Sequence, residues 1–296
     1  MTATQSVHVP RARALRRLIA AALVCVVALF VLQALFLHTQ DGQRLDDAAL
    51  RGRVVQRPRA RDASERLLRT ISVGSLALLG GGIMLIAAAR GRGMLAIGVG
   101  GVIVGANVTT QLLKHVLERP DLVNEVNVFT FNSLPSGHTT VATSLAAALI
   151  LAVPARARPF AACIGALYAT GIASMTLAAG WHRPSDAIAA FAVVGAWAFA
   201  TAAALVALRG TGLVHNRASI PVLATGSALV LLVAFAALIA TTSLTMTAGI
   251  ETVKIGIAFL LAAGTIVGVG VALLASLVLL LRGISLDSPR HELART

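Results

Sequence analysis

The sequence predicts an all-α fold, a polytopic transmembrane bundle of about eight helices, from its composition and from the spacing of its apolar runs. The 296-residue chain is 57% hydrophobic and 12% charged, whereas an ordinary soluble domain has about 25% charged residues. Its mean hydropathy is +0.85. Apolar runs of about 20 residues, the length that crosses a bilayer, recur along it. These features exclude a soluble globular domain.

Each apolar run is interpreted as one helix. The runs cover residues 18–37, 67–89, 94–113, 139–153, 160–179, 187–208, 220–239 and 255–281. The first run follows a cluster of arginines and has no small-residue cleavage site after it, so we expect an uncleaved anchor and not a signal peptide. The 139–153 run is short, as expected of a helix whose N-terminal end lies in a polar cavity.

The net charge of +13 comes almost entirely from arginine, since Lys114 and Lys254 are the only lysines. Such a balance suits anionic membrane surfaces and anionic substrates. Nucleic-acid binding is the rival interpretation of a basic chain. It is disfavoured because aromatic residues make up 4% of the chain and offer no stacking face. The sequence therefore predicts membrane lipids as partners and no nucleic acid, and it leaves the oligomeric state open.

The distribution of arginines favours a cytoplasmic N-terminus. This orientation puts these loop arginines on the cytoplasmic side: Arg90, Arg92, Arg156, Arg158, Arg209 and Arg217. Segment 39–65 argues against it, because it would be external and yet carries six arginines, partly balanced by five acidic residues. The predicted organisation is a cytoplasmic N-terminus (1–17), six helices with a basic external loop (18–208, loop 39–66), two additional helices (209–284) and a cytoplasmic tail (285–296).

Polar residues inside apolar runs are costly and mark candidate sites. At the end of the third run, Asn107, Gln111 and Lys114 share one helix face, and Arg119 with Pro120 closes the segment. For Asn107 and Gln111, hydrogen bonds between helices are the simpler explanation. Lys114 either binds an anion or extends to the membrane interface.

A second polar stretch, Pro135-Ser136-Gly137-His138, comes directly before the short run. Ser136 is a suitable N-cap, and Gly137 allows close approach to the helix end, where free N–H groups form an anion site. An ordinary capped helix start explains the Ser-Gly pair alone. His138 is not needed for capping, and its imidazole can exchange a proton with a bound anion.

The third stretch is "WHRPSD", where His182 and Asp186 are four residues apart. If Pro184 opens the sixth helix, the Asp186 carboxylate can reach one imidazole nitrogen of His182 and leave the other as a nucleophile. Helix capping beside a surface histidine is the alternative for this pair alone. Together the three stretches supply the minimum for phosphoryl transfer through a phosphohistidine, with Arg119 and helix N–H groups binding phosphate oxygens. No metal-ligand constellation accompanies them, so metal-independent catalysis without a cofactor is expected.

These motifs resemble the type 2 phosphatidic acid phosphatases, relatives of vanadium haloperoxidases and bacterial acid phosphatases. The family pattern is Lys-x6-Arg-Pro, Pro-Ser-Gly-His and Ser-Arg-x5-His-x3-Asp; residues 135–138 match the second motif completely, and Arg119, Pro120, His182 and Asp186 match parts of the others. The resemblance covers about residues 67–208 and implies a six-helix phosphatase-like core. It also implies that His182 is the nucleophile, that His138 is the acid, and that Asp186 is the hydrogen-bond partner of His182. Phosphate-binding roles fall to Arg119, Ser136 and Gly137.

The chain departs from the family pattern at two cations. The family lysine would fall at Leu112, whereas Lys114 stands two residues later, and the Ser-Arg pair would fall at Met175 and Thr176. Lys114 and Arg183 are the candidates that supply the missing charge to the phosphate.

The expected function is hydrolysis of a lipid phosphate or pyrophosphate at the outer face of a bacterial plasma membrane. The arginine and alanine bias suggests GC-rich coding and favours a polyprenyl carrier, with phosphatidic acid and phosphatidylglycerol phosphate open. The alternatives are a lipid-linked phosphotransferase and a non-catalytic protein that binds or translocates polyprenyl phosphates.

Overall fold

The computed structural model describes residues 11–71, 73–89, 91–123, 132–209, 212–213, 219–241 and 249–286. Residues 1–10 of the expected cytoplasmic N-terminus, residues 287–296 of the expected tail, and the loop residues Arg90 and Arg217 lie outside them. The described elements follow this order: α1 (Arg11–His38), α2 (Gln40–Arg51), η1 (Gly52–Val55), α3 (Pro58–Leu68), α4 (Val73–Ala89), α5 (Gly93–Val116), α6 (Gly137–Ala152), α7 (Arg158–Ala178), α8 (Pro184–Arg209), β1 (Gly212–Leu213), α9 (Ser219–Thr241), α10 (Ile250–Leu280) and β2 (Ile284–Ser285).

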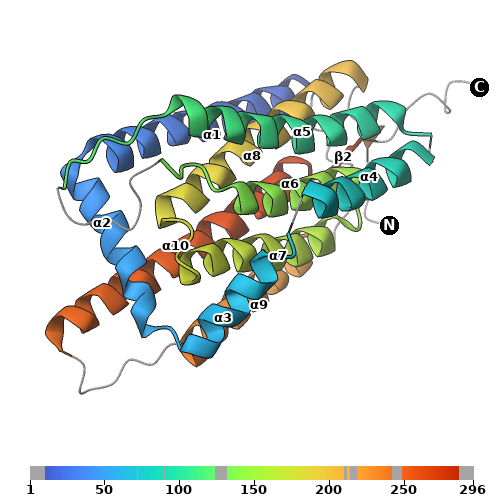
Figure 1. The fold of residues 1–296 in the computed structure, drawn as a ribbon. Helices are drawn as coiled ribbons and strands as arrows, with labels where there is room; N and C mark the ends of the chain where they lie inside the picture. Colours follow the sequence, from blue (N-terminus) through green and yellow to red (C-terminus); the bar gives the residue numbers. More distant parts are fainter. Residues whose placement is uncertain are drawn as a thin grey trace, which may run out of the picture.

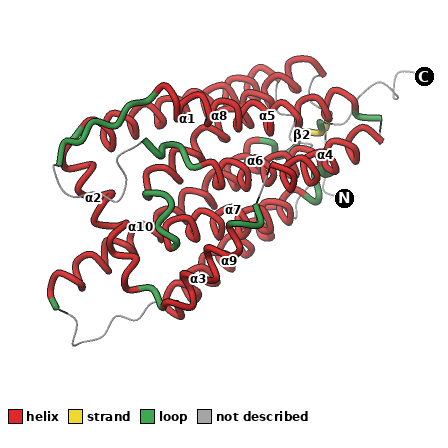
Figure 2. Tube along the Cα trace, in the orientation of Figure 1, coloured by secondary structure: helices red, strands yellow, loops and turns green. Residues whose placement is uncertain are grey.

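The described chain is almost entirely helical (Figure 2), and the prediction of an all-α polytopic bundle is confirmed. Six of its helices are long and apolar enough to cross a membrane: α1, α5, α7, α8, α9 and α10. The apolar helices α4 and α6 are shorter. The two strands form one small antiparallel pair. The protein is therefore an integral, multi-pass membrane protein.

The long helices lie side by side along one bundle axis (Figure 1). Helix α8 packs against α1, α5, α6 and α10, while α7 packs against α6, α9 and α10. Small residues make these approaches close: a Cβ on Gly165 of α7 would lie 2.7 Å from the Ala146 Cβ of α6. Buried α10 residues such as Phe259 and Ile266 belong to the same apolar core as α7 and α8. The last helix is thus integral to the bundle.

The segment expected as the external loop 39–66 is helical and carries α2, η1 and most of α3. Thr39 caps α2 by accepting a hydrogen bond from the Gly42 N–H at 3.0 Å. The α2 face that is buried against the bundle carries Gln43, Asp46, Asp47, Ala49 and Leu50. Because much of this face is polar, the hydropathy pattern that marks the other helices is absent here. Helix α2 packs against α10, α1 and α8 (Figure 1) and covers one end of the bundle.

Candidate active site

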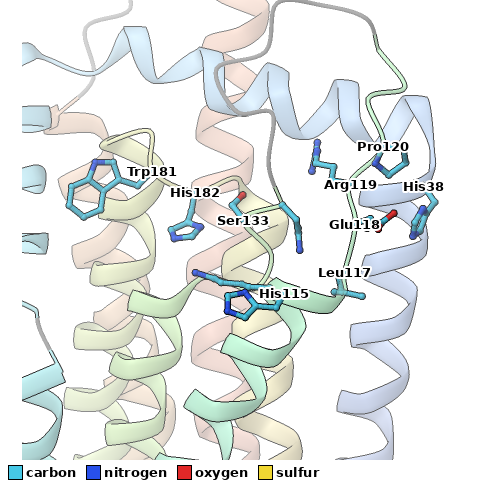
Figure 3. Close-up of a pocket in the computed structure, with 11 residues that line it drawn as sticks. His38, His115, Leu117, Glu118, Arg119, Pro120, Ser133, Trp181 and His182 are labelled. Atoms are coloured by element: carbon cyan, nitrogen blue, oxygen red, sulfur yellow. The ribbon is translucent and has the colours of Figure 1, made fainter.

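The predicted site residues gather at the end of the bundle that α2 covers. A cavity of about 910 Å³ lies between the C-terminal ends of α1 and α5 and the loop before α8. In Figure 3, Trp181 and His182 border one side of this cavity, and Arg119, Glu118 and His38 border the other. The lining residues are His38, Lys114, His115, Leu117, Glu118, Arg119, Pro120, Asn132, Ser133, Trp181 and His182. Its volume lies at the upper end of ligand-pocket sizes, about 300–1,000 Å³.

The His182 imidazole is held by the buried carboxylate of Asp186, as the four-residue spacing predicts. Pro184 is the first residue of α8, so Asp186 falls in its first turn. The His182 Nδ1 lies 3.0 Å from the Asp186 Oδ2. The same oxygen accepts hydrogen bonds from the Ser133 hydroxyl at 2.6 Å and from the Arg183 N–H at 3.0 Å. This bonding fixes the ring orientation and leaves the His182 Nε2 for chemistry.

The turn before His182 depends on Gly180, whose φ of +76° falls in the left-handed region. The N–H groups of Trp181 and His182 both donate to the Thr176 carbonyl oxygen, at 2.9 Å and 3.2 Å. The chain therefore leaves the end of α7 abruptly and presents His182 to the cavity. A residue with a Cβ is strained in this conformation.

The start of α6 lies beside the same pair. Ser136 is its N-cap and accepts from the Thr139 N–H at 3.4 Å, and the Ser136 N–H donates to the Asp186 carbonyl oxygen at 2.9 Å. A Cβ placed on Gly137 would lie 3.6 Å from the Lys114 Nζ. Lys114 therefore brings its ammonium group to the α6 N-terminus, where the helix dipole and free N–H groups also favour an anion.

His138 lies beside the cavity-lining Trp181. The two ring centroids are 5.3 Å apart, and the His138 imidazole is hydrogen-bonded to the backbone of Leu68, at the end of α3. The charges of His182 and Lys114 act on His138 at this position. His138 is thus close to the predicted nucleophile. Its predicted role as acid stays a prediction.

The two predicted arginines lie in different surroundings. The side chain of Arg119 is 6% exposed and lines the cavity, with Asp46 and Asp47 oxygens 3.9 Å and 3.8 Å away. Within the described residues, the Arg119 Nη2 has no hydrogen-bond partner. By contrast, the Arg183 Nε donates to the Asp47 Oδ1 at 2.6 Å, and Arg183 is not among the lining residues. Arg119 is therefore the arginine that lines the cavity, and the phosphate contacts of Arg119 and Arg183 both stay predictions.

Asp46 and Asp47 were not anticipated as site residues. The pKa of Asp46 is raised to about 7, because burial and the nearby charge of Asp186 outweigh the hydrogen bonds from Ser185 and the charge of Arg119. Three cations, Lys114, Arg119 and Arg183, thus gather near three carboxyl groups, Asp46, Asp47 and Asp186.

The departures from the family pattern have clear structural outcomes. Leu112 is 59% exposed on the outer side of α5, whereas Lys114, two residues later, lines the cavity. Thr176, in the place of the family arginine, is fully buried and donates its hydroxyl to the Ala173 carbonyl oxygen at 2.7 Å. Thr176 therefore adds no charge to the cavity.

Fold and site together define a multi-pass helical membrane protein with a buried His–Asp pair and cations around one cavity. Residues 95–210 of the chain match the family model described as the PAP2 superfamily. This match contains all three motifs, and it confirms the resemblance to the type 2 phosphatidic acid phosphatases. It supports phosphatase activity on phosphate esters. Comparison with curated proteins and with solved structures gave no match.

Proposed function

We propose that the protein is a lipid phosphatase that hydrolyses a lipid phosphate or pyrophosphate through a phosphohistidine on His182. The observation that carries the proposal is the His182–Asp186 pair, because its Nδ1 is bonded to Asp186 while His182 lines a cavity that Lys114 and Arg119 also line. A polyprenyl carrier is the favoured substrate, with phosphatidic acid and phosphatidylglycerol phosphate as the other candidates.

In the first step, the His182 Nε2 attacks the terminal phosphorus, and the bond from this phosphorus to the oxygen of the leaving lipid, or of the leaving lipid phosphate in a pyrophosphate, breaks. His138 gives a proton to the leaving oxygen, and the Asp186 carboxylate stabilises the positive charge that develops on the imidazole. Lys114 and Arg119 bind the phosphate oxygens and compensate charge in the transition state. Water then attacks the phosphohistidine, which releases inorganic phosphate and restores the His182 imidazole.

We place this chemistry at the outer face of a bacterial plasma membrane. Arg11 at the start of α1 donates to the Ala207 carbonyl oxygen near the end of α8, so these two helix ends lie together, away from the cavity. Arg92 before α5 donates to the Ala152 carbonyl oxygen at the end of α6, on the same side of the bundle. The positive-inside rule assigns this arginine-bearing end to the cytoplasm, and the cavity to the opposite side.

The proposal is tested by phosphate release from four lipids by the purified protein in detergent with EDTA. The lipids are polyprenyl pyrophosphate, polyprenyl phosphate, phosphatidic acid and phosphatidylglycerol phosphate. Release that persists in EDTA and is lost in His182→Ala supports a metal-independent phosphohistidine mechanism. A matched control is Glu251→Gln, an exposed residue on α10 paired with Lys254, which should keep wild-type activity.

Two outcomes would redirect the assignment. Head-group binding without release from any of the four lipids, and surviving in His182→Ala, would replace the phosphatase with a polyprenyl-phosphate binding protein. If an added alcohol speeds the loss of phosphate from the lipid and is itself phosphorylated, the protein is a phosphotransferase.

A further inference from the structure

Helix α2 connects the two loops that carry the site, although it precedes the matched family segment 95–210. One loop, residues 117–123, carries Arg119, and the other, residues 179–185, carries His182 and runs into the first turn of α8. We propose that Gln43, Asp46, Asp47 and Arg53 form a brace whose contacts position these two loops for the reaction. The proposal rests on the proposed function for its catalytic consequence, and on contacts alone for its structural part.

The first contacts hold the Arg119 loop. The Gln43 Nε2 donates to the Pro120 carbonyl oxygen at 2.7 Å, and the Gln43 Oε1 accepts from the Leu122 N–H at 3.3 Å. The Gln43 Nε2 also donates to the Leu37 carbonyl oxygen at 2.9 Å, at the end of α1. Gln43 is 1% exposed. One buried amide therefore fixes the backbone on the C-terminal side of Arg119.

The second set of contacts holds the His182 loop. Asp46 accepts from the Ser185 N–H at 3.1 Å through Oδ1 and from the Ser185 hydroxyl through Oδ2. Ser185 immediately precedes Asp186 in the first turn of α8. Asp46 therefore satisfies an N–H group at the α8 N-terminus that has no partner within the helix, and it fixes the turn that aims Asp186 at His182.

Asp47 joins the two loops directly. Its Oδ1 accepts from the Arg183 Nε at 2.6 Å and lies 3.8 Å from the Arg119 Nη2. The first distance is a short charge-assisted hydrogen bond, and the second is an ion pair beyond hydrogen-bond length. Asp47 therefore binds Arg183 tightly beside His182. It attracts Arg119 while leaving the Arg119 Nη2 donors for a ligand.

Arg53 of η1 holds the other end of the His182 loop. Its Nη1 donates to the Ala179 carbonyl oxygen at 2.8 Å, and the guanidinium lies so close to Gly180 that an added Cβ would be 1.9 Å from Nη1. Since Arg53 contacts residues 179–180 and Asp46 contacts Ser185, the loop is held at both ends.

The brace face follows from helix geometry. Gln43, Asp46 and Asp47 are spaced i, i+3 and i+4, so they share one side of α2. Asp41 and Arg44 of the same helix are exposed instead and pair with each other, with Asp41 98% exposed.

Lys114 and Arg119 are the lysine and arginine side chains that line the cavity in the described chain. The placement of Arg119 therefore acts directly on phosphate binding.

The test compares Asp47→Asn and Asp46→Asn with Asp41→Asn, the same substitution on the exposed face of the same helix. Hydrogen–deuterium exchange of peptides covering 117–123 and 179–185 reports loop order without any need for activity. We expect about tenfold faster exchange in these peptides for the brace variants Asp46→Asn and Asp47→Asn. For Asp41→Asn we expect no change in the exchange rate of these peptides. Steady-state kinetics should show a fall in kcat of about ten- to hundredfold, the size expected for misplaced catalytic groups.

A milder variant, Arg53→Gln, guards against loss of folding, because Arg53 is only partly buried and one contact is removed. It should speed exchange in 179–185 and leave 117–123 unchanged. Unchanged exchange in both loops, or wild-type kcat in Asp46→Asn and Asp47→Asn in an active preparation, overturns the brace. Faster loop exchange in a protein that releases phosphate from no lipid supports the brace and overturns the proposed function.

Discussion

Asp186→Asn separates the charge of the carboxylate from its geometry. The Asp186 Oδ2 accepts all three hydrogen bonds, from Ser133, His182 and the Arg183 N–H, whereas Oδ1 is buried without a hydrogen-bond partner among the described residues. An asparagine with its carbonyl oxygen in the Oδ2 position keeps these acceptor contacts. Its NH₂ group takes the place of Oδ1. The variant should therefore fold normally and lack only the negative charge.

The expected loss follows from the single charge-assisted hydrogen bond to His182. Such a bond is worth about 1.5–3 kcal/mol, which corresponds to about a ten- to hundredfold fall in kcat at about 1.4 kcal/mol per tenfold change. KM should change little, because Asp186 touches the imidazole and not the phosphate. The assay is steady-state phosphate release with a saturating lipid substrate, and Asp41→Asn serves as control. A folded Asp186→Asn protein with wild-type kcat would refute the role of the pair.

Three further predictions concern the cations, Asp46 and the turn. Lys114→Met should raise KM about ten- to hundredfold through loss of a charge-assisted contact, whereas Leu112→Met, on the outer side of α5, should leave KM unchanged in the same assay. The pKa of Asp46 is raised to about 7 in the fold, above about 3.9 in the unfolded chain. The stabilising contribution of Asp46 to the free energy of unfolding is thus fully present below about pH 4 and is lost as pH rises to about 7. The thermal-unfolding midpoint should therefore fall less across this pH range for Asp46→Asn than for wild type. Gly180→Ala should cost roughly 1–2 kcal/mol in backbone strain, plus displacement of Arg53, and a thermal-unfolding midpoint equal to wild type would contradict this.

The local part of the site was predictable because its signals lie within a few residues of one another. His182 and Asp186 are one helical turn apart, and Ser136 stands directly before an apolar run, so spacing alone predicted the imidazole–carboxylate contact and the N-cap. The position of Lys114 could also be read from periodicity. Two residues turn a helix by about 200°, which places Lys114 opposite the exposed Leu112.

The contribution of α2 could not be read from the sequence. Asp47 meets Arg183 across 136 positions of the chain, and no local pattern encodes such a pairing. Its helix is polar and lies in an arginine-rich stretch, so the sequence predicts a basic external loop there. The 67–89 run was also expected as one helix, whereas α3 ends at Leu68 and α4 begins at Val73. Hydropathy detects the apolar stretch, but not the break between two helices within it.

The balance of three cations and three carboxyl groups around the cavity has a consequence for proton uptake. A phosphate group brings additional negative charge into a set that is already close to neutral, so its binding favours protonation of the most easily titrated neighbour. With its pKa raised to about 7, Asp46 is one group of this set that can take up such a proton. Phosphate binding should then draw protons from solution, and its heat should depend on the ionisation enthalpy of the buffer.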